Sequence, residues 1–416
     1  MKHKERGDYV SRRYLVIADD FTGANDTGVQ LRRRGYPTEV VFATEHIPED
    51  RSIVIDTESR TGTPQSAYET VKCLVQEVDF QQYEYVIKKV DSTMRGNIPQ
   101  EIKALDEVYE PELIIFAPAL PNLGRTTIQG VQCLNGVEIC KTELARDPKN
   151  PVMEDSLVRL LEQVYHEPVQ LKTLEEIRAE HLEFSGGRIF ACDAETNENL
   201  QAVVRAVRAG QKKAMYIGTA GIADNIMEIE NPTKPVFGVV ASISTVTNRQ
   251  IQYCEGQGIT MIKVPIHDLL SGEKLPQPYR EEAVAALKRG EDTILLANTS
   301  YDRDEMQLSR EAGAKRGLDI IQIGDYVQEI IGKIAEQVLE RTEVSGVFVT
   351  GGDTALGMLR NIEAEGADIL TELLVGIPMV RVTGGRFDGL KMVTKAGAFG
   401  SEDAVSFAFR KIKEAN

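Results

Sequence analysis

Short apolar runs alternate with longer amphipathic stretches along almost the whole chain. The runs of the first half are YLVIAD, TEVVFA, SIVID, YVIKKV, LIIFAPA, RIFACDA and AMYIG. Those of the second half are VFGVVAS, ITMIKV, TILLAN, GVFVTGG, PMVRVTGG and MVTKAG. Each run has the length and β-branched content of a buried strand, whereas stretches such as 64–78 and 321–341 carry apolar residues at helical spacing. The pattern predicts an α/β fold of mostly parallel sheets flanked by helices.

The pattern is interrupted at IENPTKPV, residues 229–236, by two prolines, an asparagine and a threonine. A chain of 416 residues is too long for one ordinary core. We therefore expect two domains, residues 1–230 and 231–416, with a cleft between them. The segment HDLLSGEKLPQPYREEA, 267–283, is polar and is expected to be a loop.

Composition excludes several classes of partner. The chain has 48 basic and 64 acidic side chains, a net charge of -16, which argues against general binding to nucleic acid or to an anionic membrane. No apolar run approaches the roughly 18 residues of a membrane span, and the basic start does not fit a signal peptide. The five cysteines and five histidines show no metal-ligand spacing. We expect a cytoplasmic protein with no metal site of its own.

Polar side chains gather after the predicted strands of the first half. Ligands of open α/β sheets bind beyond the carboxyl ends of the strands, so these positions predict a polar pocket. The alternative is that the acids form a turn and a helix N-cap and that the bases form a solvated rim, which is the role expected for Lys88. The pocket candidates are Asp19, Asp20, Arg60, Lys89, Asp91, Ser92, Thr93 and Arg95.

These residue types suit a small polyhydroxylated acid. Arginine and lysine bind a carboxylate or phosphate, and we expect Arg60 and Arg95 to orient the substrate carboxylate. Asp19 and Asp20 are placed to accept hydrogen bonds from hydroxyl groups or to take a proton from one. Asp20 is the favoured functional carboxylate because Asp19 is nearer the strand.

The second half is rich in glycine and hydroxyl groups after its predicted strands. Glycines let a phosphate approach the backbone, and free helix N–H groups bind it. Neither GxxxxGK[ST] nor GxGxxG is present, so a nucleotide site and simple tight turns both remain open. The candidates are Ser242, Ser244, Gly351, Gly352, Asp353, Thr354 and Gly397.

Eight motifs in a fixed order resemble the four-carbon acid sugar kinase family, over residues 14 to about 408. They are IADDFTGANDTG, DTESR, KKVDSTMRGN, FAPALPNLGR, IGTAGIA, SISTVTNRQI, TGGDTA and TKAGAFGSEDA. The resemblance implies a first domain that binds a threonate-, erythronate- or 3-oxo-tetronate-like acid and a second that binds ATP. It also implies phosphoryl transfer to the terminal hydroxyl. Ala241 and Thr219 stand where the family often has glycine and serine.

The resemblance also assigns the candidates to sides by matching position. The substrate side is Asp19 or Asp20, Arg60, and Lys89 through Arg95, whereas the ATP side is Ser242 or Ser244, Gly351 through Thr354, and Gly397. Magnesium is expected to arrive with ATP, with Asp353 as its protein contact or, alternatively, as a helix N-cap. The stereoisomer of the acid is open, and so is a homo-oligomeric state.

Two other functions compete with this one. The segment DFTGAND, 20–26, is close to the DTxGAGD-like segment of ribokinase-type sugar kinases, although in that family it lies late in the chain. A non-enzymatic two-domain sensor of small molecules would also have two α/β lobes, but it leaves the glycine-rich site unexplained. A haloacid-dehalogenase-type phosphatase needs Asp-x-Asp, and here the acids are adjacent.

Overall fold

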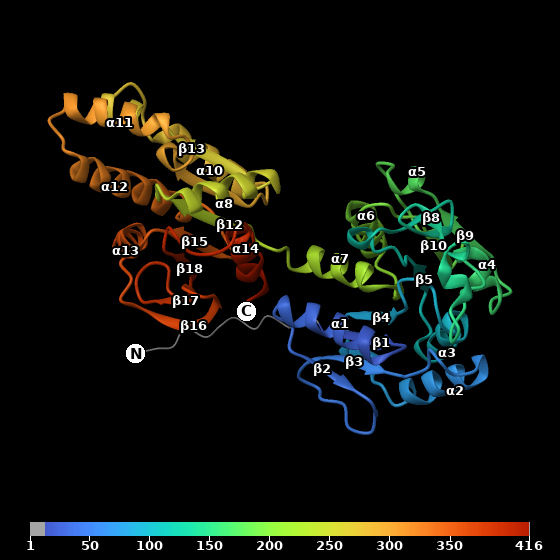
Figure 1. Ribbon diagram of the computed structural model, residues 1–416. Coiled ribbons are helices and arrows are strands. Elements are labelled where there is room, and N and C mark those ends of the chain that lie inside the picture. Colours follow the sequence, from blue (N-terminus) through green and yellow to red (C-terminus); the bar gives the residue numbers. More distant parts are fainter. Residues whose placement is uncertain (1–12, 416) are drawn as a thin grey trace. The chain divides into compact units, whose positions relative to one another are not determined.

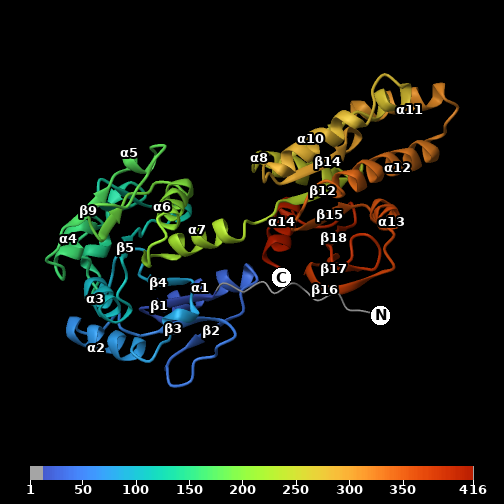
Figure 2. The same ribbon diagram turned by 180° about the vertical axis from the view of Figure 1, so that it is seen from behind.

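The computed structural model describes residues 13–415 and divides the chain into two compact units. The first unit ends at Pro232 and the second begins at Thr233, within the proline-containing stretch 229–236. Figures 1 and 2 show that each unit has its own sheet with helices against it.

The N-terminal unit is built on an eight-stranded sheet in which every strand pair is parallel. The strand order is β2-β3-β1-β4-β11-β5-β10-β9. The chain winds to one side of β1 through β2 and β3, and then continues on the other side at β4. The strands are β1 (Tyr14–Ala18), β2 (Thr38–Val41), β3 (Ser52–Asp56), β4 (Tyr85–Lys89), β5 (Leu113–Phe116), β9 (Val169–Lys172), β10 (Ile189–Cys192) and β11 (Ala214–Gly218).

Helices cover both faces of this sheet because successive strand residues point to opposite sides. Leu15 and Ile17 belong to the core under α2, α3 and α4, whereas Val16 and Ala18 belong to the core under α1, α6 and α7. A small antiparallel sheet of β6 (Arg125–Ile128), β7 (Val131–Leu134) and β8 (Val137–Glu138) follows β5. The helices are α1 (Phe21–Arg33), α2 (Pro64–Val75), α3 (Ile98–Tyr109), α4 (Leu157–Glu162), α5 (Leu174–Ile177), α6 (Asn197–Ala209) and α7 (Ala220–Glu230).

The C-terminal unit has a mixed seven-stranded sheet in the order β13-β14-β12-β15-β18-β17-β16. The first five strands in this order are parallel, and β17 and β16 are antiparallel. The strands are β12 (Val236–Val240), β13 (Thr260–Val264), β14 (Thr293–Ala297), β15 (Gly346–Thr350), β16 (Gly366–Leu374), β17 (Ile377–Thr383) and β18 (Lys391–Lys395). The helices are α8 (Thr245–Gly256), α9 (Ile266–Ser271), α10 (Gln277–Lys288), α11 (Asp304–Lys315), α12 (Ile320–Leu339), α13 (Gly352–Asn361) and α14 (Ala404–Glu414).

The predicted α/β class is confirmed, but the loop expected over 267–283 is wrong. That segment contains most of α9 and the start of α10, separated by Gly272 in the left-handed conformation (φ 83°). Pro278 falls in the first turn of α10, where a missing N–H costs nothing. Strand β16 was not predicted, because Thr371 and Glu372 split its large apolar residues into two pairs; seven of its nine residues are exposed. Among residues 13–415, no helix is long and apolar enough to cross a membrane.

Candidate functional site

The candidate residues of the N-terminal unit meet at the carboxyl ends of three neighbouring strands. Strand β1 lies between β3 and β4, and its last residue, Ala18, is in register with Asp56 on one side and Lys89 on the other. The loops that follow these strands therefore start side by side. This is the edge where the winding direction of the sheet changes, and such edges are the usual ligand sites of open α/β folds.

The Arg60 guanidinium binds both acids of the first loop. Its Nε and Nη2 donate to the two oxygens of Asp19 at 2.7 and 2.8 Å. Its Nη1 and Nη2 donate to the two oxygens of Asp20 at 2.5 and 2.8 Å. Burial alone would lower the pKa of Arg60, but hydrogen bonding and charge from Asp19 hold it above its ordinary value. In this structure Arg60 thus orients the acids, and its predicted contact with a substrate carboxylate stays a prediction.

Asp20 is the more accessible of the two acids. The Asp19 side chain is 1% exposed, whereas that of Asp20 is 21% exposed. Asp20 is also the N-cap of α1, because its Oδ1 accepts the Gly23 N–H at 2.9 Å. The N-cap role considered as an alternative for Asp20 is therefore confirmed. The capping carboxylate still lies among the polar residues at the strand ends.

Gly23 leaves room between the acid and the nearest lysine. A Cβ atom at this position would lie 2.7 Å from Asp20 Oδ1 and 3.0 Å from Lys89 Nζ. Lys89 is buried and donates to the Val90 carbonyl at 3.0 Å. Burial lowers the pKa of Lys89, and the negative charges of Asp19 and Asp91 oppose this shift in part. Asp20, Gly23 and Lys89 thus form one compact polar surface.

Lys88 does not lie on a solvated rim, so that expectation is wrong. Its side chain is completely buried and pairs with Glu101 of α3, with Nζ and Oε2 2.9 Å apart. The other oxygen of Glu101 accepts a hydrogen bond from the Ser59 hydroxyl at 2.7 Å. The Lys88–Glu101 ion pair and the Ser59 hydrogen bond together connect β4, α3 and the loop that carries Arg60. The sequence held no signal for this contact, since its partners lie in different elements.

Asp91 organises the loop after β4. Its carboxylate accepts hydrogen bonds from Arg95 Nε at 2.9 Å and Arg95 Nη2 at 2.8 Å, and from the Thr93 hydroxyl and N–H. Burial would raise the pKa of Asp91, but these bonds and the charge of Arg60 hold it well below its ordinary value. Asp91 and Arg95 are thus paired with one another, and Ser92 between them is half-buried.

Asp56 was not singled out from the sequence, although it begins the motif DTESR. It is buried, and its Oδ2 has no hydrogen-bond partner within residues 13–415. Burial raises the pKa of Asp56 to about 6, and the negative charges of Glu58 and Asp20 add to the shift. Asp56 ends a strand that is buried throughout, and this position was the sequence signal that could have identified it as a candidate site residue.

The C-terminal candidates also converge, at the ends of the adjacent strands β12, β15 and β18. A Cβ atom on Gly397 would lie 2.5 Å from Ser242 Oγ and 3.1 Å from Ser244 Cβ. The Gly351 N–H donates to the Lys395 carbonyl at 2.9 Å, which joins the loop after β15 to the end of β18. The three glycine- and serine-containing motifs are therefore parts of one surface.

Two helices begin at this surface, and they differ in their capping. Ser244 caps α8 by accepting the Val246 N–H, whereas α13 follows Gly351 (φ 98°) and has no side-chain cap. The N–H groups of the first turn of α13, Gly352–Thr354, are thus not satisfied by a capping side chain. Asp353 is exposed in that turn, and the N-cap role considered for it is wrong because Gly351 holds that position.

Lys395 is a second residue that sequence reasoning missed. It is 2% exposed, and its Nζ donates to the carbonyls of Ala396, Gly397 and Phe399 at 3.0, 3.2 and 3.3 Å. Burial lowers the pKa of Lys395 to about 8. These hydrogen bonds fix the backbone of residues 396–399 around the Lys395 ammonium group.

An apolar cavity of about 250 Å³ adjoins the Ser242 loop. Its lining includes Ala241 and Ile243, which follow β12, and residues of α11 and α12. Its principal apolar wall residues are Ile243, Met306, Ile320, Ile323 and Val327. These residues are spread over 85 positions of the sequence, from 243 to 327, and no local motif joins them.

Comparison with known proteins agrees with this two-part arrangement. A family model described as "Sugar-binding N-terminal domain" matches residues 14–226, and one described as "Nucleotide-binding C-terminal domain" matches residues 237–405. The chain is 32% identical to a D-threonate kinase of Salmonella typhimurium, over 96% of this chain and 98% of that one. It is 26% identical to a D-erythronate kinase of Heliobacterium modesticaldum, over 94% of each chain.

A solved structure extends the comparison to the fold. It is a Bordetella bronchiseptica protein described as a domain of unknown function with bound citrate, in a domain-swapped dimer. The TM-score is 0.59 at 26% identity, over 97% of this chain and 99% of that one. Because the family models cover most of the sequence and the resemblance of the motifs is confirmed, this chain belongs to the four-carbon acid sugar kinase family.

Proposed function

We propose that this protein is an ATP-dependent kinase that phosphorylates the terminal hydroxyl of a four-carbon sugar acid of the threonate, erythronate or 3-oxo-tetronate type. The observation that carries the proposal is the pair of acids at the end of β1, held by Arg60 beside Lys89. Residues 1–230 would bind the acid and residues 231–416 the nucleotide. The names of the relatives support the same substrate class.

On the acid side, Asp20 is proposed to hold the reacting hydroxyl and to take its proton. Phosphoryl transfer has a loose transition state, so positioning and charge stabilisation matter more than the strength of the base. The Lys89 ammonium has three N–H donors, of which Val90 accepts one, and it is the proposed anchor of the substrate carboxylate. Arg95 and the hydroxyl groups of Ser92 and Thr93 complete the proposed acid-binding site.

On the nucleotide side, the uncapped first turn of α13 is proposed to bind the phosphates. Helix N–H groups and the helix dipole favour an anion at this place, and Gly351 and Gly352 leave the backbone open to it. Gly397, Ser242 and Ser244 would contact the same phosphates, and the neighbouring apolar cavity would hold the base.

Replacing Gly397 with alanine is expected to raise the KM for ATP at least about tenfold, with little change in the KM for the acid. The added Cβ would lie 2.5 Å from Ser242 Oγ and force the two loops apart. The measurement is steady-state kinetics with each substrate varied. Gly357→Ala is a matched control, because it lies in α13 with no atom within 4 Å of its Cβ position. Equal losses for both substrates would contradict a local nucleotide role.

Magnesium is proposed to enter with ATP. The ion usually keeps several waters and binds one or two carboxylates plus phosphates, and the exposed Asp353 beside the open turn of α13 fits that donor set. Bound there, it would supply charge neutralisation at the phosphates. Excess EDTA is expected to abolish turnover, and added Mg²⁺ to restore it. Full activity in excess EDTA would reject the metal requirement.

The substrate class is tested by an ADP-release assay over threonates, erythronates and 3-oxo-tetronates of both configurations. Turnover is expected with at least one of them. Absence of turnover with all of them, in a folded protein that binds ATP, would reject the proposed class. A ribokinase-like enzyme would instead turn over neutral sugars, and a sensor would bind ligand without releasing ADP.

We further propose a homo-oligomer in the cytoplasm. The Bordetella relative is described as a domain-swapped dimer, which supports self-association, and a kinase needs the ATP of the cytoplasm. Light scattering after size exclusion is expected to give at least twice the 46.1 kDa mass of the chain. A monomeric mass at micromolar concentration would reject the oligomer.

A further inference from the structure

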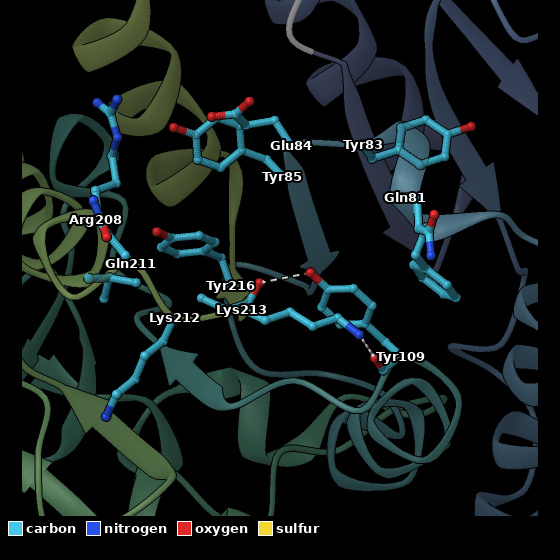
Figure 3. A pocket seen from close by; sticks show the side chains of 13 residues that line it. Gln81, Tyr83, Glu84, Tyr85, Tyr109, Arg208, Gln211, Lys212, Lys213 and Tyr216 are labelled. Atoms are coloured by element: carbon cyan, nitrogen blue, oxygen red, sulfur yellow. Dashed lines mark hydrogen bonds between the residues drawn. The ribbon is translucent and has the colours of Figure 1, made fainter.

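A cavity of about 520 Å³ lies in the N-terminal unit, at the opposite edge of the sheet from the acids. Tyr85 begins β4 at this edge, whereas Lys89 ends the same strand beside Asp20. Four residue steps along a strand are roughly 13 Å, so the cavity is separate from the candidate acid site. Its volume is within the usual range of small-molecule pockets. Figure 3 shows the side chains that line it.

Aromatic rings form much of the wall. Tyr83, Tyr85, Tyr109 and Tyr216 are all mostly buried, and Phe80 packs on Tyr109 with ring centroids 4.8 Å apart. The Tyr85 and Tyr216 rings lie 6.1 Å apart. Such surfaces favour a flat partner, because offset and edge-to-face ring contacts add to the gain from burial.

Two cations at the cavity are held in fixed positions. Lys213 Nζ lies 4.2 Å from the centre of the Tyr109 ring and donates to the Tyr109 carbonyl. Arg208 Nη1 is 2.7 Å from a carboxylate oxygen of Glu230, to which the Tyr85 hydroxyl also donates. Because these contacts already position the two side chains, Lys213 and Arg208 would lose little conformational entropy on binding an anion.

The charge of the lining is positive although the chain as a whole carries -16. Arg208, Lys212 and Lys213 line the cavity, against one acid, Glu84. The Glu230 carboxylate, which pairs with Arg208, neutralises one of these three positive charges. A local positive balance on an acidic protein favours an anionic ligand.

Tyr216 adds a hydrogen-bond donor to the lining of the cavity. The residue is 3% exposed and lines the cavity, and Figure 3 draws no hydrogen bond from its hydroxyl to the other lining side chains. Burial raises the pKa of Tyr216 above its ordinary value, so the group remains a neutral donor. A ligand acceptor atom in the cavity could therefore accept a hydrogen bond from the Tyr216 hydroxyl.

We propose that this cavity binds a small planar anion, an aromatic ring that carries a carboxylate or a phosphate. The ring stacks among the tyrosines, the anionic group contacts Arg208 and Lys213, and an acceptor atom meets the Tyr216 hydroxyl. The site does not depend on the proposed kinase activity, since it lies at the other edge of the sheet.

The test is calorimetric titration of the full chain with 4-hydroxybenzoate and, separately, with adenosine monophosphate. Excess ADP and threonate are present, so that the proposed kinase sites are occupied. At least one probe is expected to bind one-to-one, about tenfold more weakly to Tyr216→Phe and to Lys213→Gln. Tyr253→Phe and Lys141→Gln are the matched controls, outside the cavity, and are expected to bind as the unaltered protein does.

The two probes also distinguish the source of the anion. Binding of the benzoate alone identifies an aromatic acid, and binding of the monophosphate alone identifies a nucleotide. Inorganic phosphate and phenol are expected to bind at least tenfold more weakly than the better probe. No binding by either probe, binding unchanged in both cavity variants, or equal affinity for inorganic phosphate would overturn the proposal.

Discussion

Asp20→Asn is expected to reduce turnover by at least about 10²-fold and to leave ATP affinity unchanged, because general-base catalysis typically contributes about 10²- to 10⁴-fold. An asparagine oxygen can still accept the Gly23 N–H, so the cap of α1 survives and the fold is preserved. The charge that would hold and deprotonate the hydroxyl is lost. The measurement is kcat by ADP release, with ATP affinity from calorimetry on the same preparation.

Asp19→Asn is the matched comparison for this substitution. Asp19 also binds Arg60 through both oxygens, but it is 1% exposed and has less access to a substrate. We expect it to lose more stability and less turnover than Asp20→Asn. Near-normal turnover in Asp20→Asn, together with loss of turnover in a folded Asp19→Asn, would mean that the two roles are reversed.

Arg60→Ala is expected to lower both the stability of the N-terminal unit and turnover. Removing one partner of a buried ion pair typically costs about 3–5 kcal/mol, and here Asp19 would be left buried without its cation. Turnover should fall at least about 10²-fold, because both acids lose the guanidinium that orients them. The nucleotide site belongs to the other compact unit, so ATP affinity should be retained.

Urea denaturation and ATP calorimetry measure these two effects. Arg51→Ala is a control, since Arg51 pairs with Asp50 and Glu39 on the surface, and its loss should cost less than about 1 kcal/mol. If Arg60→Ala does not fold, Arg60→Lys keeps the charge without the fork that binds two carboxylates. Equal loss of acid and ATP binding in a folded variant would indicate a general defect and contradict the positioning role.

Much of the fold could be predicted, because strands buried on both faces of a parallel sheet are nearly continuous apolar runs. Strands β1, β3, β4 and β11 were evident for this reason, and their order along the chain placed the polar motifs at strand ends. Elements without such a run were missed: β16 is mostly exposed, and α10 buries only one face of a polar sequence. An apolar pattern along the chain does not reveal a helix or strand that is buried on one face only or exposed on both.

The sequence by itself determined the α/β class, the strand-end positions of the acids and bases, and the family to which the motifs belong. Only the tertiary structure decided which charge pairs with which. Arg60 reaches Asp19 across 41 positions because β3 lies next to β1 in the sheet, and Lys88 is buried because α3 brings Glu101 to it. Spacing along a chain specifies the faces of helices and strands, whereas contacts between elements depend on sheet order and helix packing, which no local pattern encodes.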